Sequence, residues 1–253
     1  MTTDLLSSRS PPLLSPTSAL LLDFDGTLVE LAAHPDAVSP SAGLAGWLYQ
    51  LAKHLDDALA IVTGRRLREV DRHLDPLRLM GAGAYGAELR MAIAGKTTPV
   101  IAALDAPLIA AIEAAISDLS GIWMENKTYA LAVHYRQHPA LAAECLARVQ
   151  QAAQPFGQIE VFTGHAVVEV RRKGLGKGAA ISFLLQHPTF SGRMPVFVGD
   201  DLADEEGFTA VQAAGGHGVK VGTGDSAAHY RLADVPAVHR WLCESLMQLR
   251  RTS

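Results

Sequence analysis

The sequence predicts an α/β protein in which a doubly wound parallel sheet is interrupted by an inserted α+β domain. Near both ends of the chain, short apolar runs alternate with helical patterns, which is typical of right-handed parallel units. Between them, hairpins and alternating strands favour an antiparallel sheet with helices. We therefore expect a flexible tail at residues 1–17, a parallel domain at residues 18–87 and 172–253, and the insert at residues 88–171.

The strands of the parallel domain are predicted from apolar runs without alternation, because a strand buried on both faces has no polar side. The helix after the first strand shows apolar spacing from Leu44 to Leu55. In chain order we expect strands within residues 19–24, 57–65, 77–89, 194–201 and 218–222, and helices within 39–55, 65–74 and 177–186, from about Asp204, and within 235–251.

The insert is predicted from turn residues and from alternating apolar and polar positions. In order, we expect a hairpin within residues 88–100 around Gly95, a helix within 105–121 capped by Gly121, strands within 122–136, a helix from Pro139, and a hairpin within 159–172 turning at Thr163 and Gly164.

The composition argues against several classes of protein. Of the 253 residues, 49% are hydrophobic, enough for a large core, and a net charge of −4 argues against a nucleic acid partner. No apolar run reaches the roughly 18 residues of a membrane span, and prolines interrupt the opening residues where a secretory signal would lie. Cys145 and Cys243 lie in apolar helical patterns, so we expect free thiols and a cytoplasmic protein.

Acidic residues follow two of the predicted parallel strands. Asp23 and Asp25 come after the first strand, and Asp200, Asp201 and Asp204 come after a later one. The carboxyl ends of parallel strands share one edge of the sheet, where ligands bind in open α/β folds. Crowded carboxylates repel one another unless a cation lies among them, and Mg²⁺ prefers oxygen ligands. The sequence therefore predicts a Mg²⁺ site, although an isolated Asp pair is more often a cap and a solvated side chain.

Two further residues suit a phosphate group. Thr63 follows the second strand with a hydroxyl group and neighbouring backbone N–H groups. Lys177 begins a helix, where the dipole and the free amides favour an anion. Taken singly, a strand-end Thr is commonly a cap and a Lys beside Gly a solvated turn residue.

These residues occur in motifs that resemble the haloacid dehalogenase-like (HAD) phosphatases. The motifs are DFDGT at 23–27, TGR at 63–65, Lys177 before a helix and GDDLADE at 199–205. More narrowly, ENKTYALAVHYR at 125–136 and VVEVRRKGLGKGAAI at 167–181 are similar to the trehalose-6-phosphate phosphatase family. The similarity covers nearly all of residues 19–245 and implies a Rossmann-like HAD core whose insert is a cap domain.

The resemblance implies roles for the residues at the strand ends. Asp23 would attack phosphorus to form an aspartyl-phosphate, and Asp25 would be the general acid and base. Thr63 and Lys177 would hold the phosphoryl charge.

The resemblance also implies a metal site and its surroundings. Mg²⁺ would be bound by Asp23, by the backbone carbonyl of Asp25 and by Asp200. Asp201 and Asp204 would act from outside the ligand shell, through water or by orienting the lysine.

Substrate binding is implied for Arg65 and for three residues of the cap, Glu125, Lys127 and Glu169. Charged groups make strong hydrogen bonds to sugar hydroxyls. Without the resemblance, MENK and VVEV would be read as exposed alternating strands.

We therefore expect a Mg²⁺-dependent phosphatase that hydrolyses trehalose 6-phosphate in trehalose biosynthesis, with a functional link to the synthase that makes this sugar phosphate. Alternatives are hydrolysis of another sugar phosphate such as sucrose 6-phosphate, a phosphomutase, or a non-catalytic regulatory domain that binds a sugar phosphate.

Tyr85 stands where the family pattern has His, which affects contacts at the mouth of the site. His134 and His138 have zinc-like spacing, but they lie on a predicted strand, where that spacing does not align two ligands.

Overall fold

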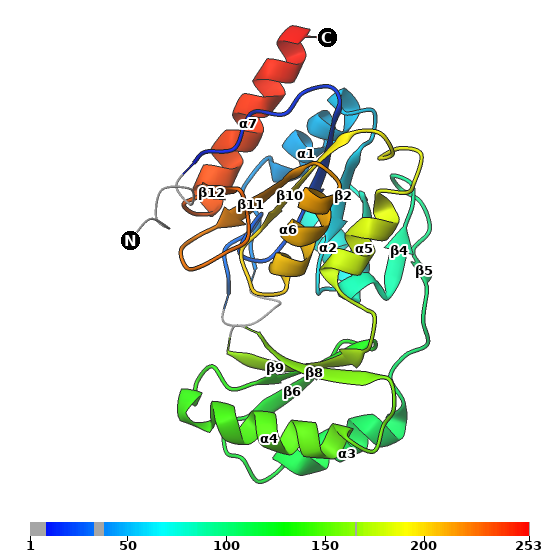
Figure 1. Ribbon diagram of the computed structural model, residues 1–253, viewed down its shortest axis with the longest axis vertical. Coiled ribbons are helices and arrows are strands. Elements are labelled where there is room, and N and C mark those ends of the chain that lie inside the picture. Colours follow the sequence, from blue (N-terminus) through cyan, green and yellow to red (C-terminus); the bar gives the residue numbers. More distant parts are fainter. Residues whose placement is uncertain (1–8, 33–37, 165, 253) are drawn as a thin grey trace. The chain divides into compact units, whose positions relative to one another are not determined.

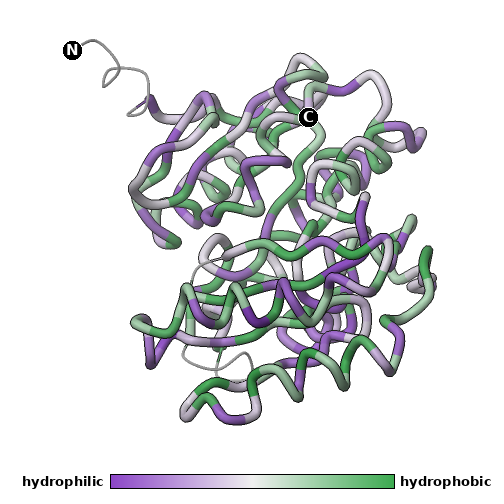
Figure 2. Tube along the Cα trace, turned by 60° about the horizontal axis from the view of Figure 1, so that its bottom comes forward, coloured by the Kyte–Doolittle hydropathy of each residue, from purple (hydrophilic) through white to green (hydrophobic). Residues whose placement is uncertain are grey.

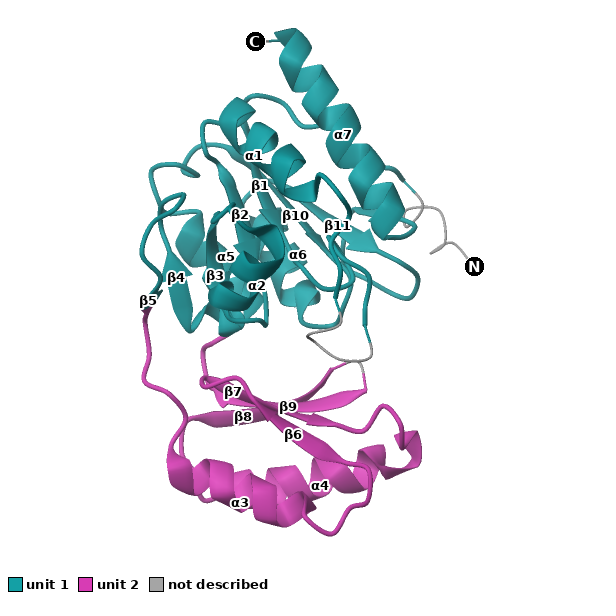
Figure 3. Ribbon diagram, turned by 180° about the vertical axis from the view of Figure 1, so that it is seen from behind, with its two compact units in different colours: residues 1–98, 176–253 teal, residues 99–175 magenta. Residues whose placement is uncertain are grey.

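The computed structural model describes residues 9–32, 38–164 and 166–252. The chain forms two compact units, which Figure 3 distinguishes by colour. Unit 1 comprises residues 1–98 and 176–253, and unit 2 comprises residues 99–175.

Unit 1 is built on an eight-stranded sheet with the order β12-β11-β10-β1-β2-β3-β4-β5. The strands from β12 to β3 pair in parallel, and β4 is antiparallel to β3. The strands are β1 (Ser18–Leu22), β2 (Leu59–Val62), β3 (Met80–Gly83), β4 (Glu88–Arg90), β5 (Thr98–Pro99), β10 (Met194–Gly199), β11 (His217–Val221) and β12 (Tyr230–Leu232). The expected fold class is therefore confirmed.

Helices cover both faces of this sheet. Helices α5 (Lys177–Leu184) and α6 (Asp204–Ala213) pack together on one face, and α1 (Leu44–His54) packs against α7 (Val235–Thr252) on the other (Figure 1). A short helix, α2 (Leu67–Leu74), follows β2. Because both faces are covered, β1 and β2 are buried along their whole length, as their unbroken apolar runs predict.

The first unit boundary differs from the expected position between residues 87 and 88. The predicted hairpin within 88–100 belongs to the large sheet, because β4 pairs with β3. Arg90 of β4 is buried, and its guanidinium donates to both carboxylate oxygens of Asp71 on α2, at 2.7 and 2.6 Å. This long-range ion pair fixes β4 to unit 1, so the division falls after Thr98.

The described part of the expected tail, residues 9–17, packs on unit 1. The Leu14 side chain is buried, and the Leu14 N–H donates to Ser245 Oγ at 3.2 Å. Trp241 of α7 donates its indole N–H to the carbonyl of Pro12 at 3.1 Å. The expectation of a flexible tail is thus corrected for these residues, and residues 1–8 lie outside the described ranges.

Unit 2 is an antiparallel sheet with the order β6-β7-β9-β8. Its strands are β6 (Trp123–Asn126), β7 (Ala130–His134), β8 (Ile159–Gly164) and β9 (Val167–Arg172). Helices α3 (Ala106–Ile116) and α4 (Ala142–Ala153) pack against each other. Helix α3 is almost entirely apolar, whereas α4 carries both hydrophobic and hydrophilic residues, as the hydropathy colours of Figure 2 show for the chain. Their apolar sides share a core with alternate residues of β7 and β9, so the other face of the sheet carries the remaining side chains.

A few local expectations differ from the structure. Strand β8 runs through Gly164, so Thr163 and Gly164 belong to the strand and not to the expected turn. The next residue, His165, is outside the described residues. Gly121 has a positive φ of 77°, but α3 ends five residues earlier, at Ile116, so it is not the cap of that helix. A 3₁₀ turn at Pro139–Leu141 precedes α4.

Within the described ranges, no helix has the length and apolar character to span a membrane.

Candidate active site

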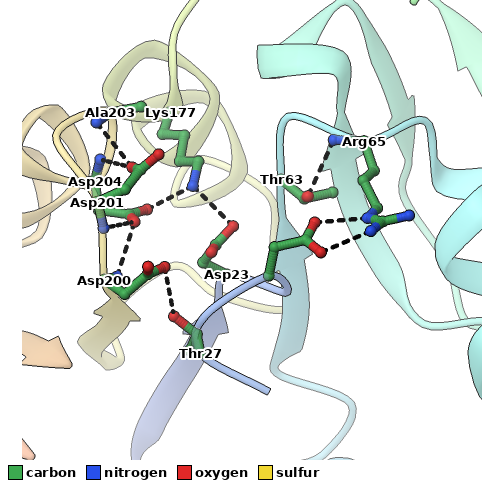
Figure 4. Close-up of polar contacts among 10 residues, drawn as sticks. Asp23, Thr27, Thr63, Arg65, Lys177, Asp200, Asp201, Ala203 and Asp204 are labelled. Atoms are coloured by element: carbon green, nitrogen blue, oxygen red, sulfur yellow. Dashed lines mark hydrogen bonds and ion pairs between the residues drawn. The ribbon is translucent and has the colours of Figure 1, made fainter. Parts of the chain in front are cut away.

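The site of unit 1 forms where β1 and β10 end at one edge of the sheet. These strands are parallel neighbours in a register that pairs Leu22 with Val198. Asp23 continues this pairing, because its N–H donates to the Val198 carbonyl at 2.9 Å. The next residues of the two strands, Asp23 and Asp200, therefore lie close together (Figure 4).

Three carboxylates form a compact group there. Oxygens of Asp23, Asp200 and Asp204 all lie within 4.8 Å of one another, and Asp23 and Asp204 are buried. The turn after β1 approaches this group closely, since a Cβ at Gly26 would collide with the Asp200 carboxylate. Gly26 also has a φ of 74°, a conformation that favours glycine, which explains the glycine of the DFDGT motif.

Lys177 supplies the positive charge of the group. Its Nζ donates to Oδ1 of Asp23 and to Oδ1 of Asp204, each at 2.7 Å. All three side chains are at least 95% buried. Burial by itself would lower the pKa of Lys177, but Asp204 and Asp23 hold that pKa well above its usual value. The lysine is therefore a permanent cation between two carboxylates.

Lys177 does not balance the charge of all the carboxylates around it. Burial raises the pKa of Asp23 to about 8, in opposition to Lys177 and in the same direction as the charges of Asp200 and Asp201. Burial, followed by the charges of Asp204 and Asp201, raises the pKa of Asp200 to about 7. Both carboxylates would be ionised more readily if a further cation were bound, so this oxygen-rich group fits a hard divalent metal ion.

Asp201 and Asp204 stabilise the loop that precedes α6. Asp201 Oδ1 accepts hydrogen bonds from the N–H groups of Ala203 and Asp204, at 2.9 and 3.2 Å. Asp204 Oδ2 accepts from the N–H groups of Asp200 and Asp201, both at 3.0 Å. Although burial acts to raise the pKa of Asp201, the charge of Lys177 and these hydrogen bonds lower it. Asp204 thus contacts both the lysine and the loop, and Asp201 contacts the loop. Their place outside the ligand shell stays a prediction, and Asp204 belongs to the group of carboxylates that could hold a metal ion.

The Asp25 carboxylate contacts Arg65 of the TGR motif. Arg65 Nε donates to Asp25 Oδ2 at 2.6 Å, and Arg65 Nη2 donates to Asp25 Oδ1 at 2.7 Å. Thr63 is buried, and its Oγ1 accepts a hydrogen bond from the Arg65 N–H at 3.1 Å. The hydroxyl of Thr63 therefore holds the turn in which Arg65 lies.

The three candidate sugar-binding residues lie in unit 2. Glu125 and Glu169 are both paired with Ala132 of the strand between them, so they occupy one row across the sheet. Lys127 Nζ lies 3.8 Å from Glu125 Oε2. Because the apolar residues that alternate with Glu169 face the helices, this row lies on the opposite face. The structure thus places two carboxylates and an ammonium group on one side of the sheet of unit 2.

Comparison with known proteins identifies the family. The sequence model of the trehalose-phosphatases matches residues 21–236. The chain belongs to this family. It is 40% identical over 233 residues to the trehalose-6-phosphate phosphatase of Escherichia coli K12, covering 91% of this chain and 87% of that protein. It is also 37% identical to a probable trehalose-phosphate phosphatase of Sinorhizobium fredii, over 81% of this chain and 77% of that one.

A solved structure shows the same fold. The C-terminal domain of trehalose-6-phosphate phosphatase from Candida albicans superposes with a TM-score of 0.80 and 23% identity, over 92% of this chain and 93% of that one. The resemblance to the trehalose-phosphatase and HAD phosphatase families is thereby confirmed.

Lys220 is a member of this trehalose-phosphatase site that sequence reasoning missed. It lies on β11, its side chain is mostly buried, and Nζ donates to the backbone carbonyl of Asp200. Its charge lowers the pKa of Asp200, although less than burial raises it. The available signal was a single lysine inside the apolar run GVKVG, where a buried cation needs a partner.

Tyr85, which departs from the family pattern, connects two parts of the site through its backbone. Its N–H donates to the Thr63 carbonyl at 3.1 Å, and its carbonyl accepts from Gly176, the residue before Lys177, at 2.9 Å. Both bonds use main-chain atoms, so they are compatible with either Tyr or His. The departure therefore leaves the connection between the TGR turn and α5 intact.

The two histidines with zinc-like spacing are not members of the group of possible metal ligands found among the described residues. That group, which could hold a metal ion, contains Asp23, Asp200 and Asp204. His134 stacks on Trp123 with ring centroids 4.0 Å apart and lies 3.1 Å from Glu125 Oε2. The contacts with Trp123 and Glu125 therefore explain the position of the His134 ring without a metal ion.

Proposed function

We propose that this protein hydrolyses trehalose 6-phosphate to trehalose and phosphate through an aspartyl-phosphate on Asp23. The observation that carries the proposal is the buried group in which Lys177 bridges Asp23 and Asp204 beside Asp200. A nucleophilic carboxylate next to a fixed cation suits attack on a dianionic phosphate ester. Membership of the trehalose-phosphatase family and the names of both bacterial relatives support the sugar as substrate.

We further propose Mg²⁺ as the metal of this site. Asp23 and Asp200 would hold it with carboxylate oxygens, and the backbone carbonyl of Asp25 would add a third oxygen. The donors are all hard oxygen ligands. Burial and neighbouring carboxylates raise the pKa of Asp23 and of Asp200, so a bound cation would favour the ionised form of both. When bound, the ion neutralises charge on the phosphoryl oxygens.

In the first step, a carboxylate oxygen of Asp23 attacks phosphorus. The bond between phosphorus and the sugar oxygen breaks, and Asp25 gives its proton to that oxygen so that trehalose leaves as an alcohol. Lys177 holds Asp23 in place and provides positive charge beside the phosphoryl group, and the hydroxyl of Thr63 is a further donor near it.

In the second step, water attacks phosphorus of the aspartyl-phosphate. Asp25 takes a proton from this water, the bond between phosphorus and the Asp23 oxygen breaks, and inorganic phosphate forms. Asp23 returns as a carboxylate and Asp25 as an acid, so the enzyme is ready for another substrate. Asp23 and Asp25 therefore complete the two steps with water as the only reactant besides the ester.

Recognition of the sugar is assigned to the cap residues Glu125, Lys127 and Glu169. Their position in one patch on one face of the sheet of unit 2 suits hydrogen bonding to several hydroxyl groups of a disaccharide. We also expect a cytoplasmic enzyme, because Cys145 and Cys243 are free thiols, and a functional link to the synthase that supplies the sugar phosphate.

The proposal is tested by phosphate release from trehalose 6-phosphate, sucrose 6-phosphate, glucose 6-phosphate and p-nitrophenyl phosphate, each with Mg²⁺ and with EDTA. We expect Mg²⁺-dependent turnover with a strong preference for trehalose 6-phosphate. Equal hydrolysis of all four esters would reject the cap assignment and keep the phosphatase core. Binding of trehalose 6-phosphate without turnover would instead indicate a regulatory domain.

A further inference from the structure

The bidentate contact between Arg65 and Asp25 assigns a role to Arg65 that differs from substrate binding. We propose that Arg65 is a positioning residue, whose guanidinium holds the carboxyl group of Asp25 in the orientation needed to give a proton to the leaving sugar oxygen and, in the second step, to take one from water. The inference rests on the proposed function, because it concerns the residue that acts there as acid and base.

The geometry of the pair supports orientation rather than simple charge balance. Two different guanidinium nitrogens, Nε and Nη2 of Arg65, reach the two different oxygens of Asp25, at 2.6 and 2.7 Å. Such a fork fixes the plane of the carboxylate as well as its position, whereas a lysine at this place would provide a point charge.

Arg65 is itself held in place by contacts of its backbone and its side chain. The Arg65 N–H donates to Thr63 Oγ1 at 3.1 Å, and its carbonyl accepts from the Ala84 N–H at 2.7 Å. Its guanidinium carbon lies 5.8 Å from the centre of the Phe24 ring, the residue between the two aspartates of the DxD motif. Contacts on both its backbone and its side chain therefore hold Arg65 in place.

The two side chains differ in their exposure to solvent. The Asp25 side chain is 31% exposed and that of Arg65 only 9%. Solvent therefore reaches the carboxylate more readily than the guanidinium behind it. This order suits an arginine that acts through Asp25, with the carboxylate facing the reacting atoms.

The role predicts that loss of Arg65 depends on the leaving group. Trehalose needs a proton as it leaves, whereas p-nitrophenolate leaves as an anion. The ratio kcat/KM reports all steps up to transfer to Asp23. For Arg65→Gln we expect kcat/KM with trehalose 6-phosphate to fall by about 10²-fold, mostly in kcat, and kcat/KM with p-nitrophenyl phosphate by less than about threefold.

A double-mutant cycle separates action through Asp25 from direct action on phosphate. If Arg65 only positions Asp25, Arg65→Gln has no further effect on kcat/KM once Asp25→Asn is present. Arg65→Lys should recover part of the trehalose 6-phosphate activity, because the charge remains but the fork is lost. Equal losses with both substrates, or full additivity in the cycle, would overturn the proposal in favour of direct phosphate binding.

Two controls keep this result distinct from other failures. Arg78→Gln, which removes an exposed arginine paired with Asp71, should leave kcat/KM for both esters unchanged. Thermal melts show whether Arg65→Gln is folded, and a merely unfolded fraction would lower both activities equally. If the wild-type protein turns over neither ester, the proposed function itself has failed, before Arg65 is considered.

Discussion

The ammonium nitrogen of Lys177 lies 2.7 Å from Oδ1 of Asp23, although 154 positions separate the two residues in the chain. The same nitrogen contacts Asp204 at the same distance. Strand β1, helix α5 and helix α6 thus meet at one buried cation. Lys177 therefore contributes both to the stability of unit 1 and to its proposed chemistry.

Removal of this cation should destabilise the protein. Lys177→Met leaves Asp23 and Asp204 buried beside each other without a positive partner, which costs on the order of 3 kcal/mol and lowers Tm by roughly 6–12 °C. Differential scanning calorimetry measures this change. Lys53→Met is the matched control, because Lys53 forms an exposed ion pair with Asp57 and its loss should leave Tm nearly unchanged. Equal Tm values for the two variants would contradict the prediction that Lys177 stabilises the folded protein.

The metal-free protein should lose stability as the pH rises. Because the pKa of Asp200 is about 7 in the folded protein and 3.8 ordinarily, the folded state binds more protons between these values. This contribution to stability is fully present below pH 3.8 and is lost as the pH rises through 7. In EDTA, Tm should therefore fall by roughly 3 °C or more between about pH 5 and 8, beyond any fall seen in Asp200→Asn.

Mg²⁺ should reverse this fall, because the cation binds the deprotonated carboxylates and competes with the proton. The rise in Tm caused by Mg²⁺ is therefore expected to grow from about pH 5 to pH 8. If Asp200→Asn retains both the fall in EDTA and the response to Mg²⁺, Asp200 is not the group responsible.

Asp201 and Asp200 are neighbours with different predicted roles. Asp201→Ala removes the acceptor for two N–H groups at the start of α6 and should cost about 1 kcal/mol. Asp201→Asn keeps an acceptor oxygen, so it should retain most of the Tm and of the Mg²⁺ response. Asp200→Asn should lose the Mg²⁺ response. A calorimetric Mg²⁺ titration checks this, and equal losses in both asparagine variants would place Asp201 among the ligands.

The cap residues should affect substrate affinity more than chemistry. Glu125→Gln and Glu169→Gln each weaken charge-assisted hydrogen bonds to sugar hydroxyls, so KM for trehalose 6-phosphate should rise about tenfold. Activity with p-nitrophenyl phosphate should stay unchanged, because it has no sugar. Glu144→Gln on α4 is the control, since α4 packs on the helix side of the sheet. A kcat effect with both esters would argue against sugar recognition.

Local patterns predicted much of the fold, and long-range contacts account for most of what they missed. The unbroken apolar run of β1 and the acidic residues after it predicted a buried strand with a site at its end. The ion pair of Arg90 with Asp71, which joins β4 to the large sheet, leaves no periodic trace in the sequence. The packing of Pro12 against Trp241 is equally invisible, because the tail looks polar and broken by prolines.

Within the site, too, local patterns were predictive and long-range contacts were not. The motifs brought Asp23, Lys177 and Asp204 to attention because each follows a strand or begins a helix. The contact of Arg65 with Asp25 depends on side-chain geometry across two loops, so the TGR motif did not reveal it.

The most direct test of the mechanism is detection of the phosphoryl group on Asp23. The reaction with trehalose 6-phosphate and Mg²⁺ is quenched in acid during turnover, and the peptides are analysed by mass spectrometry. We expect the added mass of one phosphoryl group on the peptide that contains Asp23, and neither adduct nor turnover in Asp23→Asn. Turnover by Asp23→Asn at the wild-type rate, or a phosphoryl group on another residue, would contradict the account.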